Sequence, residues 1–241
     1  MRYIISLSNR FDIDPVLLPD YSETLDSGIW KEYTPIPEGG TPLSAIKEAA
    51  SKNATYIDLG NARENNAGIY LRNNFRTRYC KLDTPIGINA TDLFVKMLSS
   101  TSGKKIPLCL QKERNRCIDS YIDAHKYVSG IRAVVFGDEE LVPSITAFCC
   151  EIGMLPVLCA SEGQISFEIE KRITYDKRLN ITIVEDTDFD FIEQMVKDLK
   201  PDIMIGTGKG NHISIKYDIP LVRVGFPVHD RFGASRVLMC G

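Results

Sequence analysis

Short apolar runs alternate with amphipathic segments through the second half of the chain, and this alternation restricts the fold more than any other feature of the sequence. Each run has the length of a buried strand, and the first ends at the turn Gly137-Asp138. Strands that alternate with helices are typical of a parallel sheet with right-handed crossovers. The predicted strands are residues 131–136, 154–159, 181–185, 202–205 and 221–224, and the predicted helices are residues 141–152, 167–172, 189–199 and 212–217.

The first half fits a second α/β unit. Thr41 and Pro42 predict a helix start, with Thr41 as the N-cap. A long helix with apolar residues at helical spacing ends at Gly130 and is expected to link two sheet domains. The sequence therefore predicts two flavodoxin-like or Rossmann-like units with parallel sheets, at residues 1–104 and 105–241. Further predicted elements are helices at residues 1–10, 44–51, 62–74, 91–98 and 110–128, and strands at residues 16–18 and 55–59.

Composition excludes several classes of protein. The 241 residues carry a formal net charge of −3, which provides no electrostatic footprint for nucleic acid. No apolar run approaches the roughly 20 residues needed to cross a bilayer. The seven cysteines form no Cys-x-x-Cys pair, and their odd number excludes a complete disulfide framework. We expect a cytoplasmic globular protein with neither nucleic acid nor membrane as its partner.

The stretch from Lys200 to Arg231 carries the most distinctive local pattern. Gly206, Gly208 and Gly210 follow a predicted strand and open a predicted helix, so free backbone N–H groups there could hold an anion, with Lys209 adding charge. The pattern is neither a P-loop nor the complete Gly-x-Gly-x-x-Gly fingerprint. A tight strand-to-helix turn without a ligand is the favoured explanation of the pattern.

The segment His229-Asp230-Arg231 follows the last predicted strand. Histidine at this edge, with His212 nearby, could bind a metal or transfer protons. The sequence shows no Ser or Cys nucleophile motif, so a catalytic triad is unsupported. The alternative is a packing or interface role, which loops at this edge often have.

A pair of aspartates and a group of three arginines could each form a binding site or simply lie on the protein surface. Asp119 and Asp123 lie one helical turn apart and could bind a metal or perform acid–base chemistry, but neighbouring opposite charges favour ion pairs. Arg72, Arg76 and Arg78 could form an anion site or simply a solvated face.

Several longer motifs resemble the nitrogenase component 1 family on its β-type side. They are PIGINATDLF at residues 85–94, KERNRCIDSYIDAHKYVSG at 112–130, VVFGDEELV at 134–142, EIGMLPV at 151–157, and PDIMIGTGKG with IPLVRVGFPVHDR at 201–231. Upstream, VLLPDYSETLDSG at residues 16–28 and EGGTPLSAI at 38–46 are similar to the β-like scaffold subunit that helps to build the iron–molybdenum cofactor.

The resemblance implies an α-like partner in a heterotetramer, the iron protein as a further partner, and an iron–sulfur cluster or cofactor precursor in the full complex. The cluster cysteines are expected in an amino-terminal domain ahead of the LPD segment, so we expect no metal site, catalytic residue or cofactor in these 241 residues. The segment from Ser161 to Asn180 is shorter than in catalytic β subunits, which favours a cofactor-assembly scaffold that is not an enzyme on its own. The alternatives are the β subunit of nitrogenase or of a nitrogenase-like reductase, and a small-anion binding module.

Overall fold

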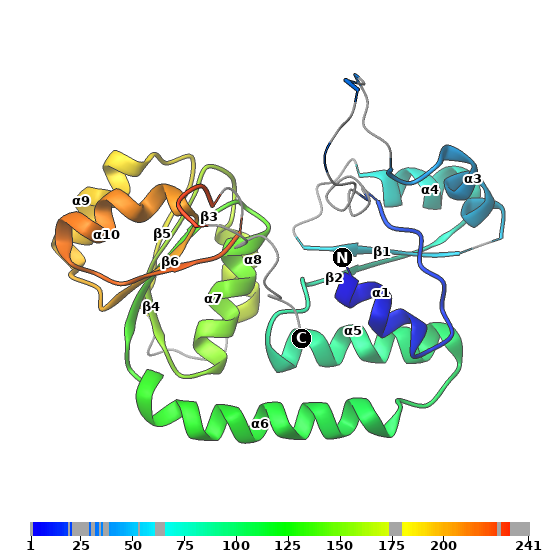
Figure 1. The fold of residues 1–241 in the computed structure, drawn as a ribbon, viewed down its shortest axis with the longest axis horizontal. Coiled ribbons are helices and arrows are strands. Elements are labelled where there is room, and N and C mark those ends of the chain that lie inside the picture. Colours follow the sequence, from blue (N-terminus) through cyan, green and yellow to red (C-terminus); the bar gives the residue numbers. More distant parts are fainter. Residues whose placement is uncertain are drawn as a thin grey trace. The chain divides into compact units, whose positions relative to one another are not determined.

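The computed structural model describes residues 2–18, 20, 29, 32–33, 35, 39–52, 54–60, 66–173, 180–225 and 228–231 (Figure 1). The chain divides into two compact units whose segments interleave. One unit contains Met1–Asp58, Ala62–Leu82 and Leu93–Leu110, and the other contains Leu59–Asn61, Asp83–Asp92 and Gln111–Gly241. The simpler boundary between residues 104 and 105 stays a prediction.

The second unit is built around a five-stranded sheet in which every neighbouring pair is parallel. Its strands follow the order β5-β4-β3-β6-β7, so the chain starts at the centre, grows to one edge, and then returns to fill the other. This confirms the predicted parallel α/β sheet and matches the Rossmann strand order more closely than the flavodoxin order. The strands are β3 (Arg132–Gly137), β4 (Leu155–Ser161), β5 (Thr182–Val184), β6 (Ile203–Gly206) and β7 (Leu221–Arg223).

Helices cover both faces of this sheet (Figure 1). Val135 and Ile205 belong to a core cluster with residues of α7 (Leu141–Glu151) and α8 (Ser166–Ile173). Val134 and Met204 belong to a second cluster with residues of α9 (Phe189–Leu199) and α10 (Asn211–Tyr217). Val134 and Val135 are 0% and 1% exposed, as expected for a central parallel strand buried on both faces. The remaining elements of this half are the 3₁₀ helix η1 (Gly208–Gly210) and most of α6 (Leu108–Val128).

The first unit contains the two-stranded sheet β1-β2 and several helices. Gly68 of α4 packs on this sheet, where a Cβ atom would lie 2.5 Å from the Tyr56 ring and 2.6 Å from the Tyr79 ring. Those two rings stack with their centroids 6.2 Å apart. The elements are α1 (Arg2–Asn9), α3 (Leu43–Ser51), β1 (Thr55–Leu59), α4 (Ala67–Phe75), β2 (Arg78–Leu82) and α5 (Gly87–Ser102), whose first turns belong to the second unit.

Some predictions for the first half were wrong. Residues 16–18 form no strand, and Val16 and Leu18 are 42% and 38% exposed, because their apolar side chains enter no core. Pro42, not Thr41, is the N-cap of α3, since the Thr41 hydroxyl donates to the carbonyl of Leu17. The structure also contains β2, which the sequence analysis missed. Helix α5 begins at Gly87 rather than at residue 91.

Other expected features lie partly or wholly outside the described residues. They include most of the polar segment between residues 20 and 37, part of the segment between residues 161 and 180, and Phe226-Pro227 of the family motif. Within the described ranges, none of the helices is both long and apolar enough to span a bilayer.

Candidate functional site

The carboxyl edge of the five-stranded sheet is where an open α/β fold places its ligands, at the point where the strand order reverses. That point lies between β3 and β6. Asp138 follows β3, and its Oδ1 atom accepts hydrogen bonds from the N–H groups of Glu140, at 3.2 Å, and Leu141, at 2.8 Å. The carboxylate is therefore already used to cap the start of α7.

Thr207 follows β6 at the same point. It is 4% exposed, and its Oγ1 atom is buried without a hydrogen-bond partner. A buried hydroxyl group of this kind costs about 1–3 kcal/mol when it is left unpaired. Thr207 is thus a polar group at the reversal point whose hydrogen-bonding capacity is unused among the described residues.

The glycine turn comprises Gly206, Gly208, Lys209 and Gly210, as the sequence predicted, and it continues into α10. A Cβ atom on Gly206 would lie 2.3 Å from the carbonyl oxygen of Phe136, and one on Gly210 would lie 2.3 Å from the tip of the Phe136 ring. These two glycines are required because Phe136 packs directly on the turn.

The charged groups beside the turn do not converge on one point. Lys209 extends toward Glu162, with 3.7 Å between Nζ and Oε1, and both side chains are largely exposed. His212 Nδ1 lies 2.9 Å from the carbonyl oxygen of Lys209, while its Nε2 lies 4.0 Å from Glu193 Oε2. Exposed pairs of this kind contribute little free energy. The geometry does not assemble the predicted anion ligands around a common centre.

The predicted segment His229-Asp230-Arg231 does meet the glycine turn, through Asp230. The Asp230 carboxylate binds the Arg223 guanidinium at 2.6 Å, and this guanidinium holds the pKa of Asp230 below its usual value. His229 and Arg231 are exposed. Arg223 was not predicted as a site residue. The available signal is its position at the end of the last strand, seven residues before an acidic residue.

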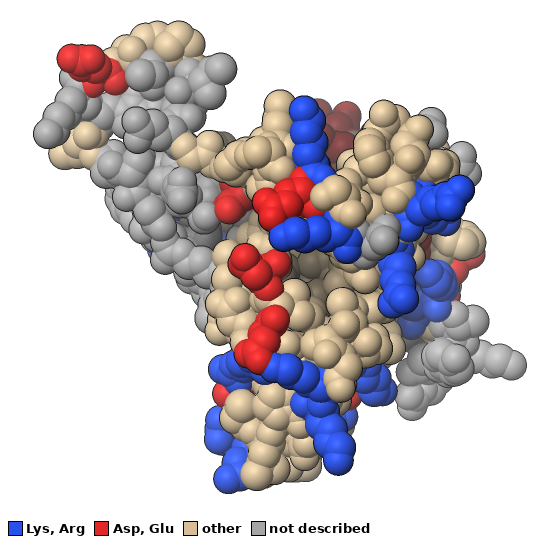
Figure 2. Space-filling model, turned by 90° about the vertical axis from the view of Figure 1, so that its right-hand side faces the viewer, with Lys and Arg blue, Asp and Glu red and all other residues tan. Residues whose placement is uncertain are grey.

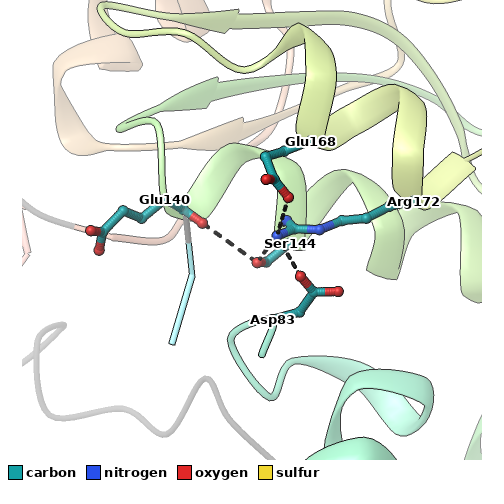
Figure 3. A network of polar contacts seen from close by, with 5 residues as sticks. All are labelled: Asp83, Glu140, Ser144, Glu168 and Arg172. Atoms are coloured by element: carbon teal, nitrogen blue, oxygen red, sulfur yellow. Dashed lines mark hydrogen bonds and ion pairs between the residues drawn. The ribbon is translucent and has the colours of Figure 1, made fainter. Parts of the chain in front are cut away.

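A second network was not anticipated at all (Figure 3). Arg172 of α8 donates to Asp83 Oδ1 at 2.6 Å, to Glu168 Oε2 at 3.3 Å and to Ser144 Oγ at 3.3 Å. The side chains of Arg172 and Glu168 are each only 6% exposed. Ser144 in turn donates to the carbonyl of Glu140 at 3.4 Å. A guanidinium this deeply buried needs such partners, so the network ties α7 and α8 to the chain at Asp83.

The other candidate groups do not form a site. In the described ranges, no group of three or more His, Cys, Asp or Glu side chains is placed to hold a metal ion. Asp119 and Asp123 are both exposed. Cys149 and Cys159 lie in the core, and burial raises the pKa of each thiol to about 12.

The three arginines of the first unit have separate local settings, and Arg78 is the exposed first residue of β2. Arg72 lies over the Tyr79 ring, 5.7 Å from its centroid, and Arg76 caps the end of α4 in a left-handed conformation. Both signs of charge mix over the face drawn in Figure 2.

A groove of about 510 Å³ lies at the opposite, amino edge of the five-stranded sheet. Lys197, Lys200, Asp202 and Asp218 line it together with apolar residues such as Tyr217. Its two lysines and two aspartates balance in charge, so it selects no ion by charge.

Comparison with known proteins gives a consistent result. The profile of the family "Nitrogenase component 1 type Oxidoreductase" matches residues 1–241. The molybdenum–iron protein β chain of Clostridium pasteurianum is 31% identical over 236 residues, which are 97% of this chain and 51% of that protein. The vanadium–iron protein β chain of Trichormus variabilis is 32% identical over 243 residues, 97% of this chain and 51% of that protein. The iron–iron protein β chain of Rhodobacter capsulatus is 30% identical over 219 residues, 89% of this chain and 47% of that protein.

Among solved structures, "Nitrogenase Cp1 at pH 6.5" superposes with a TM-score of 0.88 at 30% identity, covering 96% of this chain and 51% of that one. The chain thus spans about half the length of these relatives. With the parallel α/β fold and a family match along its whole length, the chain belongs to the nitrogenase component 1 type oxidoreductases.

Proposed function

We propose that the chain is part of a β-type subunit of a nitrogenase component 1 complex and acts in nitrogen fixation together with an α-type subunit in a heterotetramer. The observation that carries this proposal is the similarity to the Cp1 structure over 96% of the chain, with a TM-score of 0.88. The relatives named β chains support the same role. They represent molybdenum, vanadium and iron-only systems, so the proposal does not specify the metal.

The β subunit of a reductase is our first candidate, ahead of the cofactor-assembly scaffold that the sequence motifs favoured. The relatives reported above are all named as nitrogenase β chains, and their identities to this chain lie within 30–32%. The short segment from Ser161 to Asn180 still favours a scaffold, which remains the second candidate. A cytoplasmic location and the iron protein as a further partner follow from either role.

The described residues do not fit an iron–sulfur cluster or a cofactor precursor. They offer no group of three or more His, Cys, Asp or Glu side chains placed to hold a metal ion, and Cys149 and Cys159 are fully buried in the core. We therefore assign no catalytic step to these side chains. In this proposal they contribute the five-stranded sheet, and the loops at its carboxyl edge meet a partner.

Co-purification and turnover test this function. The tagged full-length product that contains this chain is co-expressed with its α-type subunit, purified anaerobically, and supplied with the iron protein, ATP and an electron donor. Reduction of dinitrogen or acetylene at rates similar to those of nitrogenase is the result expected for a β subunit. A stable complex that reduces neither, but activates a cofactor-deficient nitrogenase, would establish the scaffold instead. Failure to bind any α-type subunit would contradict both candidates.

A further inference from the structure

Residues Val228–Asp230, which we call the strap, lie directly on the glycine turn. A Cβ atom on Gly208 would lie 2.8 Å from Asp230 Oδ1, 3.3 Å from the His229 nitrogen and 3.3 Å from the Val228 Cα atom. Real Cβ atoms essentially never approach another atom within 3.0 Å. Glycine at position 208 therefore leaves room for the strap, since a Cβ atom there would displace the Asp230 carboxylate and crowd the backbone of Val228 and His229.

Arg223 holds the other oxygen of the same carboxylate. Its Nε and Nη2 atoms lie 2.7 and 2.6 Å from Asp230 Oδ2. The guanidinium is itself fixed by Asn211, whose Oδ1 accepts from Nη2 at 2.7 Å, and by the Leu221 carbonyl, which accepts from Nη1 at 3.2 Å. The Arg223 and Asp230 side chains are only 15% and 25% exposed. Charge-assisted hydrogen bonds of this geometry are among the stronger polar interactions in proteins.

The two oxygens of Asp230 therefore have separate contacts. Oδ2 faces Arg223, while Oδ1 lies over Gly208, at the turn where the sequence suggested an external anion. An anion approaching this turn would meet a carboxylate of the same sign. Lys209, the cation expected to attract it, extends toward Glu162.

We propose that Arg223 and Asp230 form a latch that seats the strap on the glycine turn, so that the turn binds the chain's own carboxylate and is closed to external anions. Arg223 and Asp230 are positioning residues in this arrangement. The latch sets the course of the backbone that carries the exposed His229 and Arg231 side chains. This inference does not depend on the role of the chain in nitrogen fixation.

Limited trypsin digestion tests the latch, because Arg231 directly follows the strap. The initial rate of cleavage after Arg231 is measured by mass spectrometry in the wild type and in the Arg223→Gln and Gly208→Ala variants, neither of which alters residues next to that bond. Lys216→Gln, which breaks an exposed ion pair with Glu193 in the same unit, is the matched control. Cleavage after Arg132 in the central strand reports global unfolding.

Opening of the latch should raise cleavage after Arg231 about tenfold in Arg223→Gln and in Gly208→Ala, with cleavage after Arg132 unchanged. Because both variants break the same contact, the double variant should be cleaved no faster than the faster single variant. An unchanged rate in both single variants, or fully additive effects, would overturn the latch. If either variant fails to fold, Asn211→Ala replaces it, because it removes a partner that fixes the Arg223 guanidinium and leaves the residues beside the cleaved bond unaltered; it should raise cleavage after Arg231 in the same direction.

A second measurement addresses the external anion directly. Calorimetry with inorganic phosphate should give no saturable heat with the wild-type chain at concentrations up to about 10 mM, near the weak limit of specific binding. Saturable phosphate binding that disappears in Lys209→Gln would show an open anion site and refute the proposal.

Discussion

Phe136 determines which residues the glycine turn can contain. Its ring and its carbonyl oxygen occupy the space that side chains at positions 206 and 210 would need. Packing against Phe136 therefore explains Gly206 and Gly210, and contact with the strap explains Gly208. A glycine-rich sequence at a sheet edge is thus explained without a ligand.

Replacing Gly210 by alanine should lower the free energy of unfolding by about 1–3 kcal/mol, the usual cost of overpacking a core. Urea unfolding followed by circular dichroism measures the loss. In the double variant Gly210→Ala/Phe136→Leu, much of this stability should be recovered, because the nearest atoms to a Cβ atom at position 210 all belong to the Phe136 ring. Phe136→Leu should restore less stability to Gly206→Ala, because the nearest atom there is the backbone carbonyl oxygen of Phe136, which this change leaves in place. Equal recovery at both positions would contradict this explanation.

Arg172 is a second residue whose replacement has a defined cost. Arg172→Met should destabilise the chain by about 3–5 kcal/mol, because it leaves the buried Glu168 carboxylate without its cation. The double change with Glu168→Gln should cost less than Arg172→Met alone. Lys216→Met, at an exposed pair, should change the free energy of unfolding by less than about 1 kcal/mol. A loss below about 1 kcal/mol for Arg172→Met in urea unfolding would show that the network contributes little.

At the scale of single residues, the sequence predicted the components of the site better than their contacts. The glycine turn and the segment from His229 to Arg231 were both expected at the carboxyl edge. Their meeting through Asp230 and Gly208 could not be predicted, because it depends on the path of the backbone after β7. Arg172 and Asp83 are 89 residues apart, and no local pattern connects them.

Carboxylates from distant segments cap the starts of two helices, α8 and α5. Glu185 Oε1 accepts from the N–H groups of Ile165 and Ser166, at 2.6 Å each, where α8 begins. Glu151 receives the N–H groups of Ile88 and Asn89 at the start of α5. Such caps satisfy amide groups that a helix start leaves unpaired and place negative charge at the positive end of the helix dipole.

The Glu185 cap predicts a specific pH dependence. Hydrogen bonds from Ser166, chiefly from its backbone N–H, lower the pKa of Glu185 in the folded chain. Its contribution to stability is therefore complete above the unfolded pKa of about 4.3 and is lost as the pH falls through the lower folded pKa. Glu185→Gln should be less stable than the wild type at pH 7, and the difference should be smaller at pH 3. A difference in urea unfolding that is the same at both pH values would exclude this cap as its cause.

Elements with strong periodicity were predicted well. Helix α9 was expected at residues 189–199 and is found there, and the predicted strand at residues 131–136 differs from β3 by one residue at each end. Strand β2 was missed because Arg78 and Lys81 interrupt its apolar residues. Residues 16–18 have the composition of a strand, yet they pair with no other strand, since pairing depends on tertiary context.

For the whole molecule, iron content is the most direct test of where the clusters reside. The 241-residue chain, reconstituted anaerobically with iron and sulfide and then desalted, should retain no stoichiometric iron, because the described residues offer no ligand cluster. Inductively coupled plasma mass spectrometry provides the measurement, with an assembled nitrogenase component 1 complex as the positive control. Tightly held iron that a Cys→Ala change abolishes would contradict this expectation and identify the ligand.

The strand order has a consequence for synthesis on the ribosome. Strand β3 pairs with β4 soon after both have been made, but its other edge waits for β6, with Val135 paired to Ile205 seventy residues later. At about 5–20 residues per second, the apolar edge of the central strand stays open for several seconds. An open, apolar strand edge is a template for pairing with other chains. Nascent chains stalled between residues 161 and 203 should therefore be the most prone to aggregate and the most dependent on chaperones.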